Sequence, residues 1–197
     1  MIDDNSWRNM ILAAYPKDEA ETILVWENDL AVVQSVCQIA CDIQDEMPPR
    51  PGQCRYWTAV WVARVRDVLG LPAIQVGGDL HAFSECVYRI EDDRQFIDPS
   101  RPAFDRKWPG HSWFSLGTWI GDISMVYTSR TPTCQRELSQ VVESHFRNSD
   151  GIVRVPFFAR ESAESFDLCY TPRGVYSPAS VQRNIEVGKI ADQLGVK

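Results

Sequence analysis

Three features are scarce in this sequence of 197 residues, and each absence excludes a class of function. Lys and Arg number 20 against 27 Asp and Glu and form no dense basic run. A protein that binds a phosphate backbone needs clustered cations, so we expect no nucleic-acid partner. No apolar stretch approaches the roughly 20 residues needed to cross a bilayer, so no membrane association is expected. The start, Met1 to Asn5, is acidic, unlike a secretory signal peptide, and the sequence predicts a cytoplasmic protein.

The six cysteines include no C-x-x-C pair, and we expect free thiols rather than a disulfide framework. Cys37 and Cys41 share a helix face and could supply two metal ligands, but no second pair at suitable spacing completes a zinc site. We therefore predict no metal and no cofactor. Cys86, Cys134 and Cys169 are expected to be small buried hydrophobic residues.

Apolar residues make up 44% of the chain, enough for the core of one domain, and no repeat or low-complexity tract divides it. Helical spacing predicts helices over 6–15, 18–47, 54–69, 135–146 and 180–194. The expected buried face of the second helix is Trp26, Leu30, Val33, Cys37, Ala40 and Ile43. Alternating patterns predict strands over 72–76, 81–90, 95–97, 112–116, 119–128, 152–158 and 166–170, with turns at 77–78, 91–94 and 116–118.

This order of elements predicts an α+β fold in a single domain over 1–197. N-terminal helices come first, then a cysteine-bearing helix packed on a mostly antiparallel sheet, then C-terminal helices. Cys54 opens the third of the expected helices, and Gly70 and Pro72 end it. Unpaired N–H groups and the helix dipole at a helix start favour the thiolate form of cysteine. Cys54 is therefore the candidate nucleophile.

A thiol nucleophile needs a base, and histidine is the natural base near neutral pH. The chain has only three histidines. His145 lies inside the expected helix 135–146 and is interpreted as a packing or surface residue. The choice is therefore between His111 with Asp122 and His81 with Asp98.

Hairpin geometry separates the two pairs. If 117–118 form a two-residue turn, Asp122 lies one diagonal step from His111, about 7–8 Å at the backbone and within reach of both side chains. If 92–93 form the other turn, Asp98 faces Val87. His81 is then six residues further along its strand, roughly 20 Å away. Geometry favours His111 with Asp122.

Four sequence features together resemble the transglutaminase-like branch of the papain-fold cysteine enzymes. These are Gln53-Cys54 at a helix start, Gly70-Leu71-Pro72-Ala73 entering a strand, an H-x-W at His111 to Trp113, and a D-x-S at Asp122 to Ser124. The resemblance covers roughly 52–129, which it identifies as the catalytic core between helical extensions. It implies a triad of Cys54 as nucleophile, His111 as base and Asp122 as orienting acid. The alternative match is His81-Ala82-Phe83 with Asp98-Pro99-Ser100, close to the family's usual H-A-W and D-P-T.

The resemblance implies a cysteine peptidase, amidase or acyltransferase that forms a thioester with a protein, peptide or other amide substrate. The Cys54 N–H, with Gln53 or Trp57, could hold the oxyanion. A second hypothesis is an arylamine-acetyltransferase-like acyl carrier, which would need a pocket for an acyl donor such as coenzyme A. A third is a catalytically inactive scaffold that serves as a protein-binding module and presents four tryptophans in a groove: Trp57, Trp61, Trp113 and Trp119.

Overall fold

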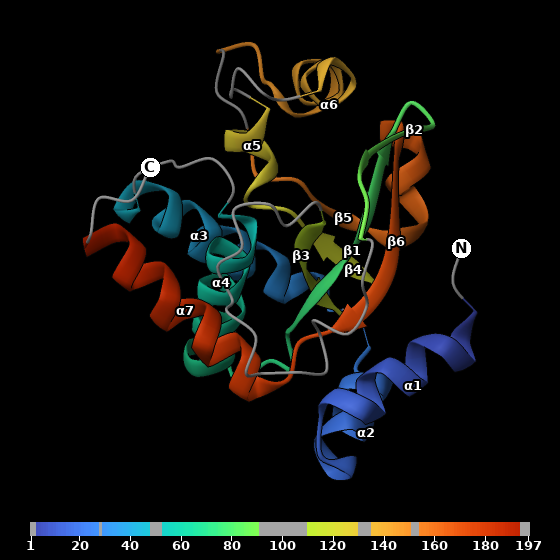
Figure 1. Cartoon of the computed structure of the whole chain (residues 1–197), viewed down its shortest axis with the longest axis vertical. Helices are drawn as coiled ribbons and strands as arrows, with labels where there is room; N and C mark the ends of the chain where they lie inside the picture. Colours follow the sequence, from blue (N-terminus) through green and yellow to red (C-terminus); the bar gives the residue numbers. More distant parts are fainter. Residues whose placement is uncertain are drawn as a thin grey trace.

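The structure, a computed structural model, describes residues 3–27, 29–47, 53–90, 110–129, 135–150 and 154–193. Within these ranges, six strands form one antiparallel sheet with helices on both faces, which confirms the α+β prediction (Figure 1). The strands are β1 (Ile74–Ala82), β2 (Glu85–Tyr88), β3 (His111–Leu116), β4 (Trp119–Gly121), β5 (Phe157–Ala159) and β6 (Leu168–Val175).

The α-helices are α1 (Asp4–Ala14), α2 (Lys17–Val25), α3 (Leu30–Glu46), α4 (Cys54–Leu69), α5 (Met125–Thr128), α6 (Arg136–Val141) and α7 (Pro178–Gln193). A π-helical turn follows α6 at Val142–Phe146, and a 3-10 helix spans Arg160–Phe166. None of the helices in the described ranges is both long and apolar enough to cross a membrane.

Strand β1 lies at the centre of the sheet. Along one edge it pairs with β6 from Val76 to Ala82. Along the other edge it pairs first with β3, over 74–78, and then with β2, over 80–82. Strands β4 and β5 extend the sheet beyond β3. Since β5 and β6 lie after residue 129, the sheet reaches well past 52–129, the expected catalytic core.

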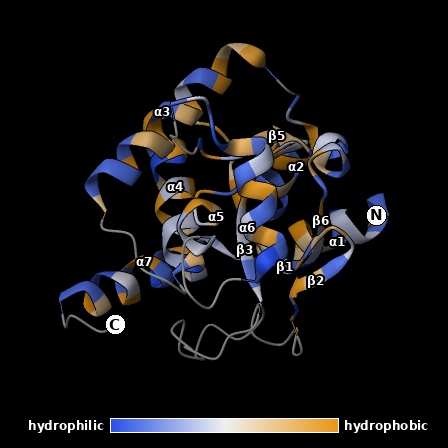
Figure 2. Cartoon of the chain, turned by 90° about the horizontal axis from the view of Figure 1, so that it is seen from above, coloured by the Kyte–Doolittle hydropathy of each residue, from blue (hydrophilic) through white to orange (hydrophobic). Residues whose placement is uncertain are grey.

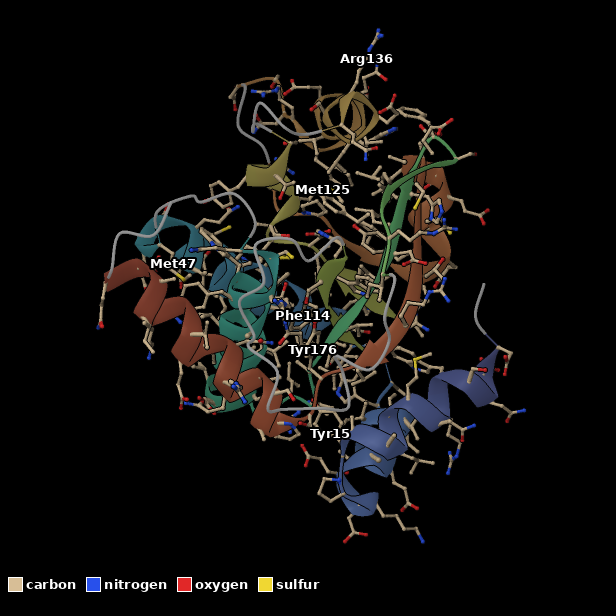
Figure 3. All side chains as sticks on the ribbon, viewed as in Figure 1. Tyr15, Met47, Phe114, Met125, Arg136 and Tyr176 are labelled. Carbon is tan, nitrogen blue, oxygen red and sulfur yellow. The ribbon has the colours of Figure 1, made fainter. Side chains whose placement is uncertain are left out.

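Two hydrophobic cores lie on opposite faces of this sheet. One packs α3, α4 and α7 against it, with Trp61, Phe114 and Tyr176 among its buried residues. Figure 3 shows Phe114 and Tyr176 between the sheet and these helices. The other packs α1, α2 and α6 on the far face, over Leu80 and Trp113. Hydrophilic residues lie on the outer turns of α3 and α7, as Figure 2 shows.

The helix predictions hold with one correction. The single helix expected over 18–47 is two helices, α2 and α3, because Asp29 caps a new start with its side chain accepting from the Ala31 N–H at 2.8 Å. Leu30 is consequently 74% exposed, and the buried stripe of α3 is Val36, Ala40 and Ile43. Helix α4 begins and ends as predicted.

The strand predictions need more correction. Residues 77–78 do not interrupt a strand, because β1 runs through them to Ala82. The strand expected over 81–90 is broken at Phe83 and Ser84, whose φ angles of 48° and 69° make the turn between β1 and β2. The strand expected over 119–128 ends at Gly121 and is followed by α5. The expected strand 95–97 and turn 91–94 lie outside the described residues.

The cysteine predictions are confirmed for the free thiols and wrong for burial. Five are described and all five are free thiols. Cys169 is exposed and Cys86 partly exposed, so neither is the buried hydrophobic residue that the sequence predicted. Cys134 lies outside the described ranges.

Candidate active site

Cys54 is the first residue of α4, and its side chain is partly exposed. The first N–H groups of a helix have no partner within the helix, so the thiol lies where backbone donors gather. The rest of α4 is deeply buried, with a continuous run of buried residues from Tyr56 to Val62. Near its start, Thr58 Oγ1 donates to the Ser112 carbonyl at 3.0 Å. The helix start is thereby fixed to β3 beside His111.

A side-chain network strengthens this attachment. Gln75, buried on β1, donates through Nε2 to the Arg55 carbonyl and to Ser112 Oγ, both at 2.9 Å. Its Oε1 accepts from Asn184 Nδ2 of α7 at 3.1 Å. Three elements around the first turn of α4 are therefore held by one buried amide, which limits movement of Cys54 relative to the sheet.

The hairpin between β3 and β4 brings His111 and Asp122 together. Gly117 takes a positive φ of 55° in the turn, and Ser115 pairs with Ile120 and Leu116 with Trp119, the register that the sequence predicted. His111 Nε2 lies 2.5 Å from Asp122 Oδ2, and both side chains are almost fully buried. The predicted proximity of this pair is confirmed.

The Asp122 carboxylate accepts four hydrogen bonds. Oδ2 takes His111 Nε2 and the Tyr170 hydroxyl, the latter at 3.0 Å. Oδ1 takes Ser124 Oγ and the Met125 N–H, each at 3.0 Å. Four donors around a buried carboxylate replace the hydrogen bonds it would make with water, and they fix its plane.

His111 connects this carboxylate to the thiol. Burial alone would lower the pKa of His111, but the adjacent Asp122 and a hydrogen bond with the Cys54 side chain raise that pKa to about 10. Because Nε2 is engaged by Asp122, Nδ1 is the ring nitrogen left for the thiol. The Tyr88 ring stacks on the imidazole at 5.1 Å, and the Trp113 ring lies at 6.4 Å. The imidazole thus lies beside two aromatic rings and hydrogen-bonds both the carboxylate and the thiol.

The other two histidines have different surroundings. The cross-strand neighbours of His81 are Cys86 on β2 and Cys169 on β6. Its buried Nδ1 has no hydrogen-bond partner within the described part of the chain. Asp98, the partner that the alternative pairing needs, lies outside the described residues. His145 Nε2 lies 3.3 Å from Asp167 Oδ2 at the surface. Within the described residues, His145 makes no hydrogen bond to a thiol.

Two of the groups expected to hold an oxyanion, Gln53 and Trp57, contact each other. Trp57 Nε1 donates to Gln53 Oε1 at 3.4 Å, and the indole packs on the Tyr127 ring at 4.5 Å. The indole N–H is therefore directed to Gln53, whose amide nitrogen is left as the side-chain donor next to Cys54. Tyr176 lies near Arg55 and the thiol, and burial raises the pKa of Tyr176.

The prediction that four tryptophans line a surface groove, made by the binding-module hypothesis, is wrong. Trp57, Trp61 and Trp113 are at most 1% exposed, and only Trp119 is partly exposed. The three buried indoles belong to the two cores rather than to a surface.

Sequence reasoning missed the residues that surround the pair: Tyr88, Ser124, Tyr170 and Tyr176. Ser124 stands in the D-x-S motif and could have been suspected as a donor to Asp122. The three tyrosines come from β2, from β6 and from the residue after β6, and nothing local in the sequence connects them to His111.

No family model matches this chain, and neither the curated proteins nor the solved structures contain a match. Within the described ranges, no group of three or more His, Cys, Asp or Glu residues could hold a metal ion.

Proposed function

We propose that this chain is a cysteine-dependent hydrolase or acyltransferase of the transglutaminase-like kind, with Cys54 as nucleophile, His111 as base and Asp122 as orienting acid. The observation that carries the proposal is the buried His111–Asp122 contact of 2.5 Å, on a histidine that also hydrogen-bonds the Cys54 side chain. A histidine between a thiol and a carboxylate is the arrangement that activates a sulfur nucleophile.

In this mechanism His111 takes the Cys54 proton and Asp122 stabilises the resulting imidazolium. The high pKa of His111, about 10, favours the thiolate–imidazolium pair over the neutral pair. The thiolate attacks the carbonyl carbon of an amide or thioester, and the negative oxygen is held by the Cys54 N–H and the Gln53 amide. His111 then returns its proton to the leaving group, which leaves an acyl group on sulfur.

The acyl group is released by water in a peptidase or amidase, or by an amine in an acyltransferase. Hydrolysis is the default, since water is always present. The substrate class that fits this chemistry is a protein, a peptide or another amide, and no step needs a cofactor.

The test uses alkylation by iodoacetamide, followed at each cysteine by mass spectrometry across pH, and requires no substrate. An ordinary thiol reacts with a midpoint near pH 8.5, whereas a histidine-paired catalytic thiol stays reactive to about pH 4. We expect Cys54 alone to react fast at pH 5, and His111→Ala to abolish this while His81→Ala leaves it unchanged.

Two results would count against the proposal. Loss of the acid reactivity in His81→Ala but not in His111→Ala would keep a cysteine enzyme but replace its base. A Cys54 that behaves like Cys41 and Cys169, the exposed cysteines, would overturn the enzymatic hypothesis and leave an inactive scaffold.

A further inference from the structure

Tyr170 reaches the candidate site from β6, 48 residues after Asp122, and its hydroxyl donates to Asp122 Oδ2 at 3.0 Å. We propose that Tyr170 is a positioning residue of the triad, whose hydroxyl holds the Asp122 carboxylate in line with His111. This inference rests on the proposed function.

The first argument is the division of donors on Asp122. Oδ2 accepts from both His111 and Tyr170, whereas Oδ1 accepts from Ser124 and the Met125 N–H. Because Asp122 is fully buried, solvent cannot replace a donor that is lost. Removing the Tyr170 hydroxyl would leave Oδ2 with His111 alone, so that His111 becomes the only group that stabilises charge on that oxygen.

The second argument is that the Tyr170 ring is held in place. Tyr170 lies opposite Leu80 in the β1–β6 ladder. The Trp113 ring meets it edge-on at 5.1 Å, and Phe158 lies at 6.2 Å. Burial and the nearby Asp122 raise the pKa of Tyr170 well above its ordinary value, so the hydroxyl keeps its proton and remains a donor. A donor fixed by packing costs little to reorganise during a reaction.

The third argument explains why Trp113 can take that position. Trp113 packs over Gly78, where a Cβ atom would lie 2.6 Å from the indole Cη2 and 2.1 Å from the Thr171 carbonyl oxygen. Absence of a side chain at Gly78 therefore lets β6 approach β1 and lets Trp113 lie against Tyr170. The backbone, the indole and the tyrosine together define one position for the hydroxyl.

The test is the pH profile of Cys54 alkylation in Tyr170→Phe, which keeps the ring and removes only the oxygen. Without this donor the Asp122 carboxylate is no longer held in line with the imidazole, so it stabilises the His111 imidazolium less. We therefore expect the acid limb of the profile to move up by about one pH unit, which lowers the rate about twofold at pH 5 and close to tenfold on the steep part of the limb near pH 3. The plateau at higher pH should change little.

Tyr15→Phe is the matched control. Tyr15 is a buried tyrosine in the same core, 5% exposed, and is not bonded to the site residues in the described structure. A general loss of a buried hydroxyl would affect both variants, whereas a positioning role moves the acid limb only in Tyr170→Phe. Far-UV circular dichroism and the melting temperature establish that both variants are folded.

A second readout is a double-mutant cycle with Asp122→Asn. An amide at this position has no charge for the hydroxyl to stabilise, so Tyr170→Phe should have no further effect on the acid limb in that background. A Tyr170→Phe profile that superimposes on the wild type, or an effect of equal size in the Asp122→Asn background, would overturn the inference. A wild-type Cys54 without reactivity at acid pH would instead overturn the proposed function, before any variant is compared.

Discussion

The molecule contains the same chemical pair, a histidine and an aspartate, in two environments. His111 and Asp122 lie 2.5 Å apart with side chains 1% and 0% exposed. His145 and Asp167 lie 3.3 Å apart with side chains 27% and 45% exposed. Of the two pairs, only the first also contacts a thiol among the described residues.

The difference between the two pairs is set by the protein around them. Asp122 is held by Ser124, Tyr170 and a backbone N–H in addition to its histidine. The surface pair is exposed to water, which weakens the attraction between the two charges. A histidine near an aspartate in sequence or space is therefore weak support for catalysis, whereas a saturated buried carboxylate on one side and a thiol on the other is much stronger support.

The largest expected effect comes from neutralising Asp122, with neutralisation of Asp167 as the control. Asp122→Asn removes the charge that stabilises imidazolium, so we expect the rate of Cys54 alkylation at pH 5 to fall by about 100-fold or more. Asp167→Asn should change that rate less than about twofold, because Asp167 contacts His145 and not the histidine that hydrogen-bonds Cys54. Quenched alkylation time courses with mass spectrometry measure both. Equal effects of the two variants would remove the distinction between the pairs.

The second effect is the dependence of stability on pH. The pKa of His111 is raised from 6.5 to about 10 on folding, so protonated His111 contributes stability that is fully present below pH 6.5 and is lost as the pH rises towards 10. We expect a loss on the order of a few kcal/mol in the free energy of unfolding across this window. Urea unfolding at closely spaced pH values measures it.

Comparison with His111→Gln isolates the contribution of His111 to the unfolding free energy, since glutamine keeps a donor near Asp122 but does not titrate. The difference in unfolding free energy between wild type and variant should shrink as pH rises through the window, while other titrating groups cancel. The same measurement on His145→Gln should give a difference that changes by less than about 1 kcal/mol, because the surface pair is solvated. If the difference in unfolding free energy between wild type and His111→Gln did not change with pH, His111 would not be protonated in the buried pair.

Much of the site could be predicted because its parts are local in sequence. Gly117 and Thr118 fix a two-residue turn, and a turn of that length fixes the register of β3 and β4. That register places Asp122 beside His111. The start of α4 at Cys54 and its end at Gly70 follow from equally local signals, the αL conformation at Gly70 among them.

The rest depends on contacts between distant segments. Gly77 and Gly78 are usually turn signals, but here they lie inside β1, where close approach of β6 and Trp113 leaves no room for a side chain at Gly78. The strand prediction over 119–128 failed because Asp122 bonds the Met125 N–H and starts a helical turn. Tyr170 belongs to the site only through the pairing of β6 with β1, which no local pattern encodes.

The smallest expected effect comes from a change in packing beside the buried His111–Asp122 pair that leaves all charges in place. Gly78→Ala adds one methyl group that would overlap the Thr171 carbonyl and the Trp113 ring, with no change to any titrating group. We expect it to destabilise the fold by about 1–3 kcal/mol. Because Trp113 lies beside both His111 and Tyr170, its displacement should also lower Cys54 alkylation at pH 5 by a few-fold.

Gly70→Ala is the control for this substitution. Gly70 has a φ of 66° with nothing within 4 Å of an added Cβ, so alanine there costs roughly 1–2 kcal/mol of backbone strain without disturbing a neighbour. Both variants should unfold at lower urea concentrations than the wild type, but only Gly78→Ala should slow Cys54. If Gly70→Ala slowed Cys54 equally, the loss would reflect general destabilisation. If neither did, the orientation of His111 would depend on its hydrogen bonds to Asp122 and Cys54 alone, and the stacked rings would serve only to keep water out.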